Sequence, residues 1–100
     1  MAGKSMTKSN RPVRRRVTFL LEDEPGKVVA VAGSFNEWLP DKQLVDKNGD
    51  GIYTGTMMLE PGTYEYKFVV NGDWRIDDRN PNFKPNDIGS LNSVLVVEAK

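Results

Sequence analysis

The sequence of 100 residues contains neither cysteine nor histidine. Without cysteine the chain can form no disulfide and offers no thiol chemistry, and without histidine it lacks the commonest general base and transition-metal ligand. No apolar stretch approaches the length of a membrane span, and no apolar segment before a cleavage site marks a secretory signal. We therefore expect one small domain that is not an enzyme, holds no metal or cofactor and enters no membrane.

Charge is distributed unevenly along the chain. Residues 1–16 carry six of the 14 basic residues and none of the 14 acidic ones, which leaves a net charge of −6 on the remainder. We expect residues 1–14 to form a disordered basic leader. A solvated leader is favoured over one that contacts nucleic acid or an acidic surface, because no aromatic residues are interleaved for base stacking. The expected location is the cytoplasm, although an acid-free leader also suits organelle targeting.

Short apolar runs separated by Gly, Pro, Asn and Asp make up the chain from residue 17 onward. Their period of two is typical of β-strands, and no stretch has the periodicity of a useful helix. The sequence therefore predicts an all-β, antiparallel β-sandwich of about seven short strands. The expected strands are residues 17–22, 27–33 (apolar on both faces and so central), 43–45, 52–59, 63–70, 73–77 and 92–98, with a long polar loop at 78–90.

Two turn sequences predict how neighbouring strands pair. If Asn71-Gly72 forms a two-residue hairpin loop, Val69 lies opposite Trp74. If Pro61-Gly62 forms the preceding turn, the two strands beside it pair directly and their apolar residues form one core face. Trp74 then lies on the wetter face of the sheet, whereas a one-residue bulge at Gly72 would turn it into the core.

Trp74 has two interpretations on that face. An exposed indole is a good platform for a sugar, because the C–H face of the sugar ring stacks on a flat π surface. Lys67, expected on the same face, can donate hydrogen bonds to sugar hydroxyls, and Trp38 could supply a second platform. In the other interpretation, Trp74 only covers neighbouring apolar side chains of the sheet edge.

The segment "DKNGDG" (46–51) matches the first half of a calcium-binding EF-hand loop. The twelfth position of such a loop must supply a bidentate glutamate, and Met57 occupies that position here. Asn, Gly and Asp are also the residues that hairpin turns favour. We therefore interpret residues 46–51 as a turn between strands and expect no metal there.

Three blocks of the sequence resemble a known family when they are taken in order. They are "VAVAGSFNEW" (29–38), "GIYTGTMMLEPGTYEYKFVVNGDWRID" (51–77) and "NDIGSLNSVLVV" (86–97). Together they resemble carbohydrate-binding module family 48, the isoamylase N-terminal early-set domains, which include the glycogen-binding domain of the AMP-activated protein kinase β subunit. The resemblance covers roughly residues 15–98. It implies an immunoglobulin-like β-sandwich with residues 15–100 as a single domain.

The resemblance also implies a set of carbohydrate-binding residues. Ile88 stands where kinase-type members have leucine, and Ser90 where they often have threonine, so each change keeps the chemical character of the side chain. The implied residues are Trp38, Lys67, Trp74, Ile88, Ser90 and Asn92.

The resemblance implies a non-catalytic module that binds an α-glucan such as glycogen, starch or a maltooligosaccharide. The two tryptophans would stack on glucose rings, while Lys67 and Asn92 would hydrogen-bond hydroxyls. The alternative is a protein-interaction or scaffolding module with a vestigial sugar site, which recruits a glucan-metabolising enzyme or a kinase. The presence of the full set of tryptophans, lysine and asparagine favours glucan binding. The initiator Met1 and the basic leader slightly favour a complete small protein, and an excised domain is the open alternative.

Overall fold

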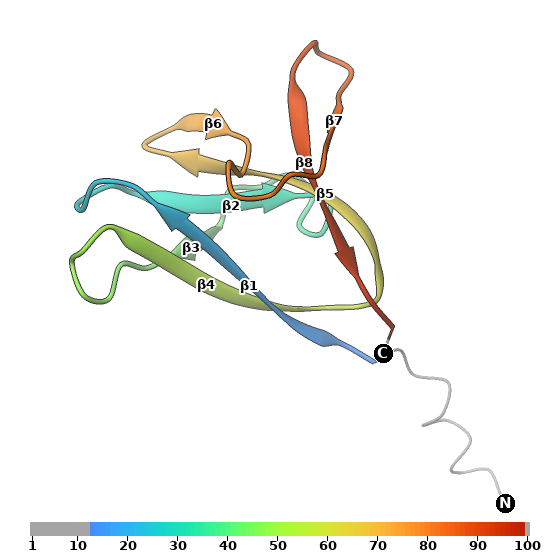
Figure 1. Ribbon diagram of the computed structural model, residues 1–100, viewed down its shortest axis with the longest axis horizontal. Coiled ribbons are helices and arrows are strands. Elements are labelled where there is room, and N and C mark those ends of the chain that lie inside the picture. The colour runs from blue at the N-terminus through green and yellow to red at the C-terminus, as the bar shows by residue number, and fades with distance from the viewer. Residues whose placement is uncertain (1–12, 100) are drawn as a thin grey trace, which may run out of the picture.

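The computed structural model describes residues 13–99, so the basic leader expected over residues 1–14 lies outside the described residues except for its last two. The described chain forms strands joined by turns (Figure 1), and it contains no helix that could span a membrane. The strands are β1 (Arg15–Glu22), β2 (Val29–Gly33), β3 (Lys42–Leu44), β4 (Ile52–Leu59), β5 (Gly62–Val70), β6 (Asp73–Arg75), β7 (Phe83–Pro85) and β8 (Leu91–Val97).

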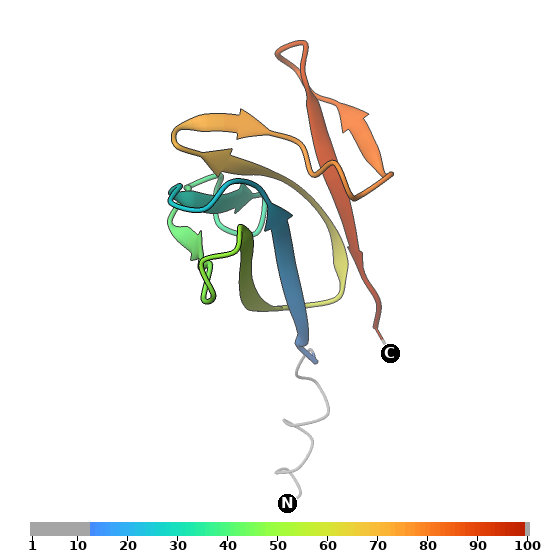
Figure 2. The ribbon, with the colours of Figure 1, turned by 60° about the vertical axis from the view of Figure 1, so that its left-hand side comes forward.

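The strands form two antiparallel sheets packed as a β-sandwich (Figures 1 and 2), which confirms the predicted fold class. β1 pairs with β4 in the smaller sheet, and the larger sheet has the order β3-β2-β5-β8-β7. β6 also pairs with β5. β2 occupies one edge of β5. The opposite edge of β5 is therefore shared by β6 and β8, which pair with different parts of it.

The core lies between the two sheets and is built from the inward-facing residues of β1 to β5, which alternate along each strand with outward-facing ones. β2 is buried over its whole length and lies between β3 and β5, as expected for a strand that is apolar on both faces. Four aromatic rings pack edge to face or tilted around Phe19 and Tyr66. The core residues are Phe19, Val29, Val31, Leu44, Tyr53, Tyr66, Phe68 and Val70.

The predicted pairing of residues 52–59 with residues 63–70 is wrong. β4 pairs with β1 over its full length, whereas β5 pairs with β2, β6 and β8. The short connection at Pro61 therefore carries the chain from one sheet to the other, along the arc that Figure 1 shows between β4 and β5. The prediction failed because apolar alternation is the same whether two strands pair within a sheet or face each other across a core.

The hairpin at Asn71-Gly72 is as predicted, with Val69 opposite Trp74. Both turn residues have positive φ, 50° for Asn71 and 89° for Gly72, as a tight type I′ hairpin loop requires. The expected loop at 78–90 is wrong in one part, because it contains β7, which pairs with β8. This strand is only three residues long and ends in proline, so it lacks the alternation that marks longer strands.

Candidate functional site: a groove on the outer face of the larger sheet

A groove of about 820 Å³ lies on the face of the larger sheet that points away from the core. The outward-facing residues of β5 form its floor, and β6, the loop after β2 and the segment joining β7 to β8 form its walls. Five of the six predicted site residues line it, and Ser90 does not. The lining residues are Ser34, Trp38, Glu65, Lys67, Trp74, Lys84, Pro85, Asn86, Asp87, Ile88 and Asn92.

Trp74 reaches the groove because alternation along β6 turns it outward. It lies opposite Val69, whose neighbours Phe68 and Val70 point into the core. Its side chain is 47% exposed, so it is neither a core residue nor fully solvated. A half-exposed indole over a groove presents a flat apolar surface to any ligand that enters.

Trp38 is presented by a loop that Asn36 shapes. The Asn36 Oδ1 accepts a hydrogen bond from the Gly33 amide at 2.9 Å, and the Trp38 amide donates to the Gly33 carbonyl at 2.9 Å. Glu37 and Trp38 have φ angles of 58° and 60°, in the left-handed region that residues other than glycine rarely adopt. The loop backbone therefore has one defined conformation, from which the partly buried indole of Trp38 projects.

Lys67 points to the groove from the centre of β5 but is only 8% exposed. Burial of the stem with the charged end at the groove is the usual arrangement of a lysine on an apolar surface. Its Nζ donates a hydrogen bond to the Ser90 Oγ at 2.9 Å. Ser90 is thus a partner of Lys67 rather than a lining residue, and the ammonium retains two further donors.

Asn92 is 7% exposed, and both ends of its amide are engaged. Its Nδ2 donates to the Glu65 Oε1 at 2.9 Å, and its Oδ1 accepts from the Asn86 Nδ2 at 3.0 Å. The hydrogen bond from Asn92, together with the Lys84 ammonium 3.3 Å from the carboxylate, lowers the pKa of Glu65. The amide orientation is therefore fixed, with one donor and one acceptor position left for a ligand.

Ile88 stands at the tip of the loop between β7 and β8 and is 84% exposed. Asn86 closes this loop: its Oδ1 accepts hydrogen bonds from the amides of Ile88 at 3.1 Å and Ser90 at 2.9 Å. The backbone amide of Asn86 donates to the Ser90 carbonyl at 3.0 Å. The loop is a compact turn organised by one asparagine side chain, a common role for this residue.

Several groove residues were missed by sequence reasoning. Glu65 could have been found, because it lies two residues before Lys67 on the same face of β5. Asn86 could have been recognised as a turn-forming residue before Gly89. No local signal marks Lys84, because its place depends on the pairing of β7 with β8. The groove is lined by two basic and two acidic side chains and so has no net formal charge.

The segment interpreted as a turn, residues 46–51, connects β3 to β4. The Asp46 carboxylate accepts hydrogen bonds from the amides of Asp50 at 3.1 Å and Gly51 at 2.8 Å. Within residues 13–99, no three side chains of His, Cys, Asp or Glu gather as metal ligands would. The Asp46 carboxylate thus organises the backbone of the turn.

Comparison with known proteins gives the groove a family context. Residues 17–100 match the family described as the glycogen recognition site of AMP-activated protein kinase. The rice protein FLOURY ENDOSPERM 6, chloroplastic, is 32% identical over 82 residues, which are 82% of this chain and 15% of that protein. The human 5'-AMP-activated protein kinase subunit beta-2 is 31% identical over 83 residues, 83% of this chain and 29% of the subunit. The kinase subunit beta of Schizosaccharomyces pombe is 40% identical over 74 residues, 74% of this chain and 24% of the subunit.

These comparisons overturn one prediction. The expected cytoplasmic location is wrong, since four of the matched plant relatives are named as chloroplastic proteins. The expectation rested on the lack of an apolar secretory segment, and such a segment is not what directs a protein into an organelle.

The predicted family resemblance is confirmed. The match begins within β1 and includes every residue that lines the groove. The chain itself corresponds to 15–29% of the length of the three relatives described above. By this match, the chain belongs to the family of glycogen recognition sites of AMP-activated protein kinase.

Proposed function

We propose that the groove binds an α-1,4-linked glucan, such as glycogen, starch or a maltooligosaccharide, and catalyses no reaction on it. The observation that carries the proposal is the meeting of two indole side chains with an ammonium, an amide and a carboxylate in one groove without net formal charge. A neutral sugar needs flat apolar surfaces for its ring faces and paired donors and acceptors for its hydroxyl groups. Membership of a glycogen-recognition family supports this ligand class.

Each of the five predicted site residues that line the groove has a role in this proposal. Trp38 and Trp74 stack on neighbouring glucose units, and the exposed tip of Ile88 contacts an apolar patch of the curved chain. Lys67 and Asn92 hydrogen-bond the hydroxyl groups. Because the groove is open rather than enclosed, we expect modest affinity.

The test is a titration of the protein with maltoheptaose, followed by amide chemical shifts, in wild type and Trp74→Ala. We expect saturable binding in wild type that weakens about tenfold or more in the variant, because burying a large apolar side chain contributes about 1.5–3 kcal/mol. Cellohexaose, a β-1,4-linked glucan without the curvature of the α-1,4 chain, should bind more weakly.

Phe83→Ala is the matched control, since Phe83 is an exposed aromatic residue that does not line the groove. Its side chain is 52% exposed, against 47% for Trp74. Maltoheptaose binding should be unchanged in this variant. No saturable shift at millimolar sugar in wild type, or undiminished binding in Trp74→Ala, would contradict the proposal and favour a scaffolding module instead.

A further inference from the structure

Trp74 sits on β6, one of the short edge strands of the larger sheet. β6 has three residues, all exposed, and within the described chain its backbone pairs on one side only, with β5. So short an edge strand is weakly constrained by its own ladder. The position of the indole therefore depends on contacts outside the sheet.

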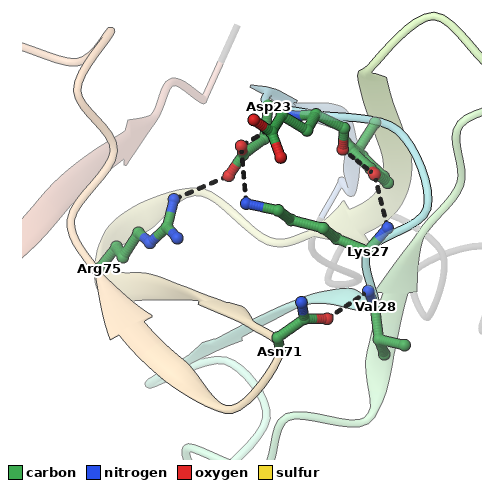
Figure 3. A network of polar contacts seen from close by, with 7 residues as sticks. Asp23, Lys27, Val28, Asn71 and Arg75 are labelled. Atoms are coloured by element: carbon green, nitrogen blue, oxygen red, sulfur yellow. Dashed lines mark hydrogen bonds and ion pairs between the residues drawn. The ribbon is translucent and has the colours of Figure 1, made fainter.

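Two such contacts join the β5–β6 hairpin to the segment between β1 and β2 (Figure 3). The Asn71 side-chain oxygen accepts a hydrogen bond from the Val28 backbone amide at 2.9 Å. The Asn71 backbone amide donates to the Val28 carbonyl at 2.8 Å. The Arg75 Nη1 donates to the Asp23 Oδ2 at 2.8 Å. One anchor precedes Trp74 and the other follows it, so the two bracket the indole.

Asp23 is itself held in place by several neighbours. Its Oδ1 accepts hydrogen bonds from the Lys27 Nζ at 3.0 Å and the Glu24 amide at 2.7 Å. Its own amide donates to the Gly51 carbonyl at 2.9 Å, at the beginning of β4. The side chain of Asp23 is 15% exposed, whereas that of Arg75 is 43% exposed. The carboxylate is thus an ordered point, directly after β1 of the smaller sheet, to which Arg75 attaches.

The alternation of side chains along β6 connects this anchor to the groove. Arg75 follows Trp74 directly, so the two side chains leave the strand on opposite faces. Trp74 faces the groove, and Arg75 reaches the smaller sheet at Asp23. An ion pair on one face of the strand can therefore fix the orientation of the indole on the other.

We propose that Asp23 is a positioning residue for glucan binding, which holds Trp74 through Arg75 without touching the sugar. This inference rests on the proposed function of the groove. Neither Asp23 nor Arg75 lines the groove. An indole that is already ordered loses less conformational entropy when a glucose ring stacks on it, so the anchor raises affinity by preorganisation.

The test uses the two tryptophans of the chain, whose indole N–H groups give two separate NMR signals. The 15N heteronuclear NOE of each indole is measured without sugar in wild type and Asp23→Asn, and maltoheptaose affinity is measured in both. Asparagine keeps an acceptor for the Glu24 amide but removes the charge that attracts Arg75. We expect a lower NOE for Trp74, an unchanged NOE for Trp38, and affinity reduced about two- to fivefold, the range of a partly exposed ion pair.

Glu22→Gln is the matched control, because it removes the same charge one residue away. Glu22 pairs with Arg79 at 3.1 Å, beyond β6, and both side chains are exposed. We expect it to change neither indole NOE nor the affinity. Arg75→Gln should reproduce the effect of Asp23→Asn, and the double variant should be no worse than either, because both remove the same contact.

Three outcomes would overturn the inference: an unchanged Trp74 NOE and affinity in Asp23→Asn, an equal effect of Glu22→Gln, or a loss of order at both indoles together with a lower denaturation midpoint. If wild type binds no maltoheptaose, the proposed function fails. The NOE comparison without sugar then tests separately whether Asp23 orders Trp74. A selective loss of order at Trp74 in Asp23→Asn supports this role, and no loss overturns it.

Discussion

Gly51 lies directly before β4 and packs closely against Asp23, which lies directly after β1. Its φ is 87°, and a Cβ added there would lie 2.0 Å from the carbonyl oxygen of Asp23. The Asp23 amide also donates to the Gly51 carbonyl, so the contact cannot open without breaking a backbone hydrogen bond. Glycine is required here both for the backbone conformation and for the space.

The expected result of Gly51→Ala is a large loss of stability, for which Gly49→Ala is the control. Gly49 has a φ of 69° and nothing within 4 Å of an added Cβ, so only the conformational cost of about 1–2 kcal/mol applies. Gly51→Ala adds a backbone clash, and we expect a further ~1–3 kcal/mol. Urea denaturation measures both, and equal free energies of unfolding would contradict this account.

Among the elements, the loop between β7 and β8 owes its shape to one side chain. Asn86 binds the amides of Ile88 and Ser90 and contacts the Asn92 amide. It therefore connects the exposed tip of the loop to the floor of the groove. Ser90 in turn accepts from Lys67, so a change at Asn86 reaches Ile88 and Asn92 through direct hydrogen bonds and Lys67 through Ser90.

Asn86→Ala should lower the free energy of unfolding by about 1 kcal/mol or more and weaken maltoheptaose binding, because it leaves loop amides without their acceptor. The measurements are urea denaturation and the sugar titration. Asn82→Ala is the control: Asn82 directly precedes β7 and is exposed. Its backbone amide donates to the Asn80 side chain and its carbonyl accepts from the Val94 amide, and the substitution keeps both hydrogen bonds. Equal free energies of unfolding and equal maltoheptaose affinities in the two variants would contradict the organising role of Asn86.

At the scale of the whole molecule, acid should weaken the link between the two sheets. Hydrogen bonds from the Glu24 amide, Lys27 and Arg75 lower the pKa of Asp23 from its ordinary 3.8 to about 2. A carboxylate whose pKa is lower in the folded state stabilises the fold fully above the unfolded value and loses that contribution as pH falls through the folded value. Glu65 acts in the same direction, since its pKa is also lowered.

We therefore expect the free energy of unfolding to fall between about pH 4 and pH 2. It should change little between about pH 5 and 8, because the chain has no histidine to titrate there. Denaturation midpoints across this range measure the effect. Asp23→Asn should flatten the acid part of the curve, and a curve parallel to wild type would show that Asp23 is not a source of the pH dependence.

Much of the layout was predictable from local pattern. Alternation identified the strands that carry the core, and the Asn71-Gly72 turn gave the register that places Val69 opposite Trp74. Both signals are local, because a two-residue loop fixes which residues face each other and alternation then fixes the side of every other residue. The family resemblance named six residues, five of which line one groove.

Local sequence pattern could not predict which strands pair with β4 and β5. Alternation assigns an inner and an outer face to each strand but does not say whether the next strand lies beside it or across the core. β7 was missed for a related reason, since three residues carry too little alternation and their pairing with β8 is a tertiary contact.

The sequence by itself determined which residues face outward on β5 and β6, because that follows from a hairpin loop and a period of two. Only the tertiary structure decided how deeply Lys67 is buried, how Asn86 and Glu65 orient Asn92, and that Arg75 reaches Asp23. Asp23 and Arg75 are 52 positions apart, and no periodicity spans that distance. They meet because two sheets pack against one core, which brings the end of β1 beside the hairpin that carries Trp74.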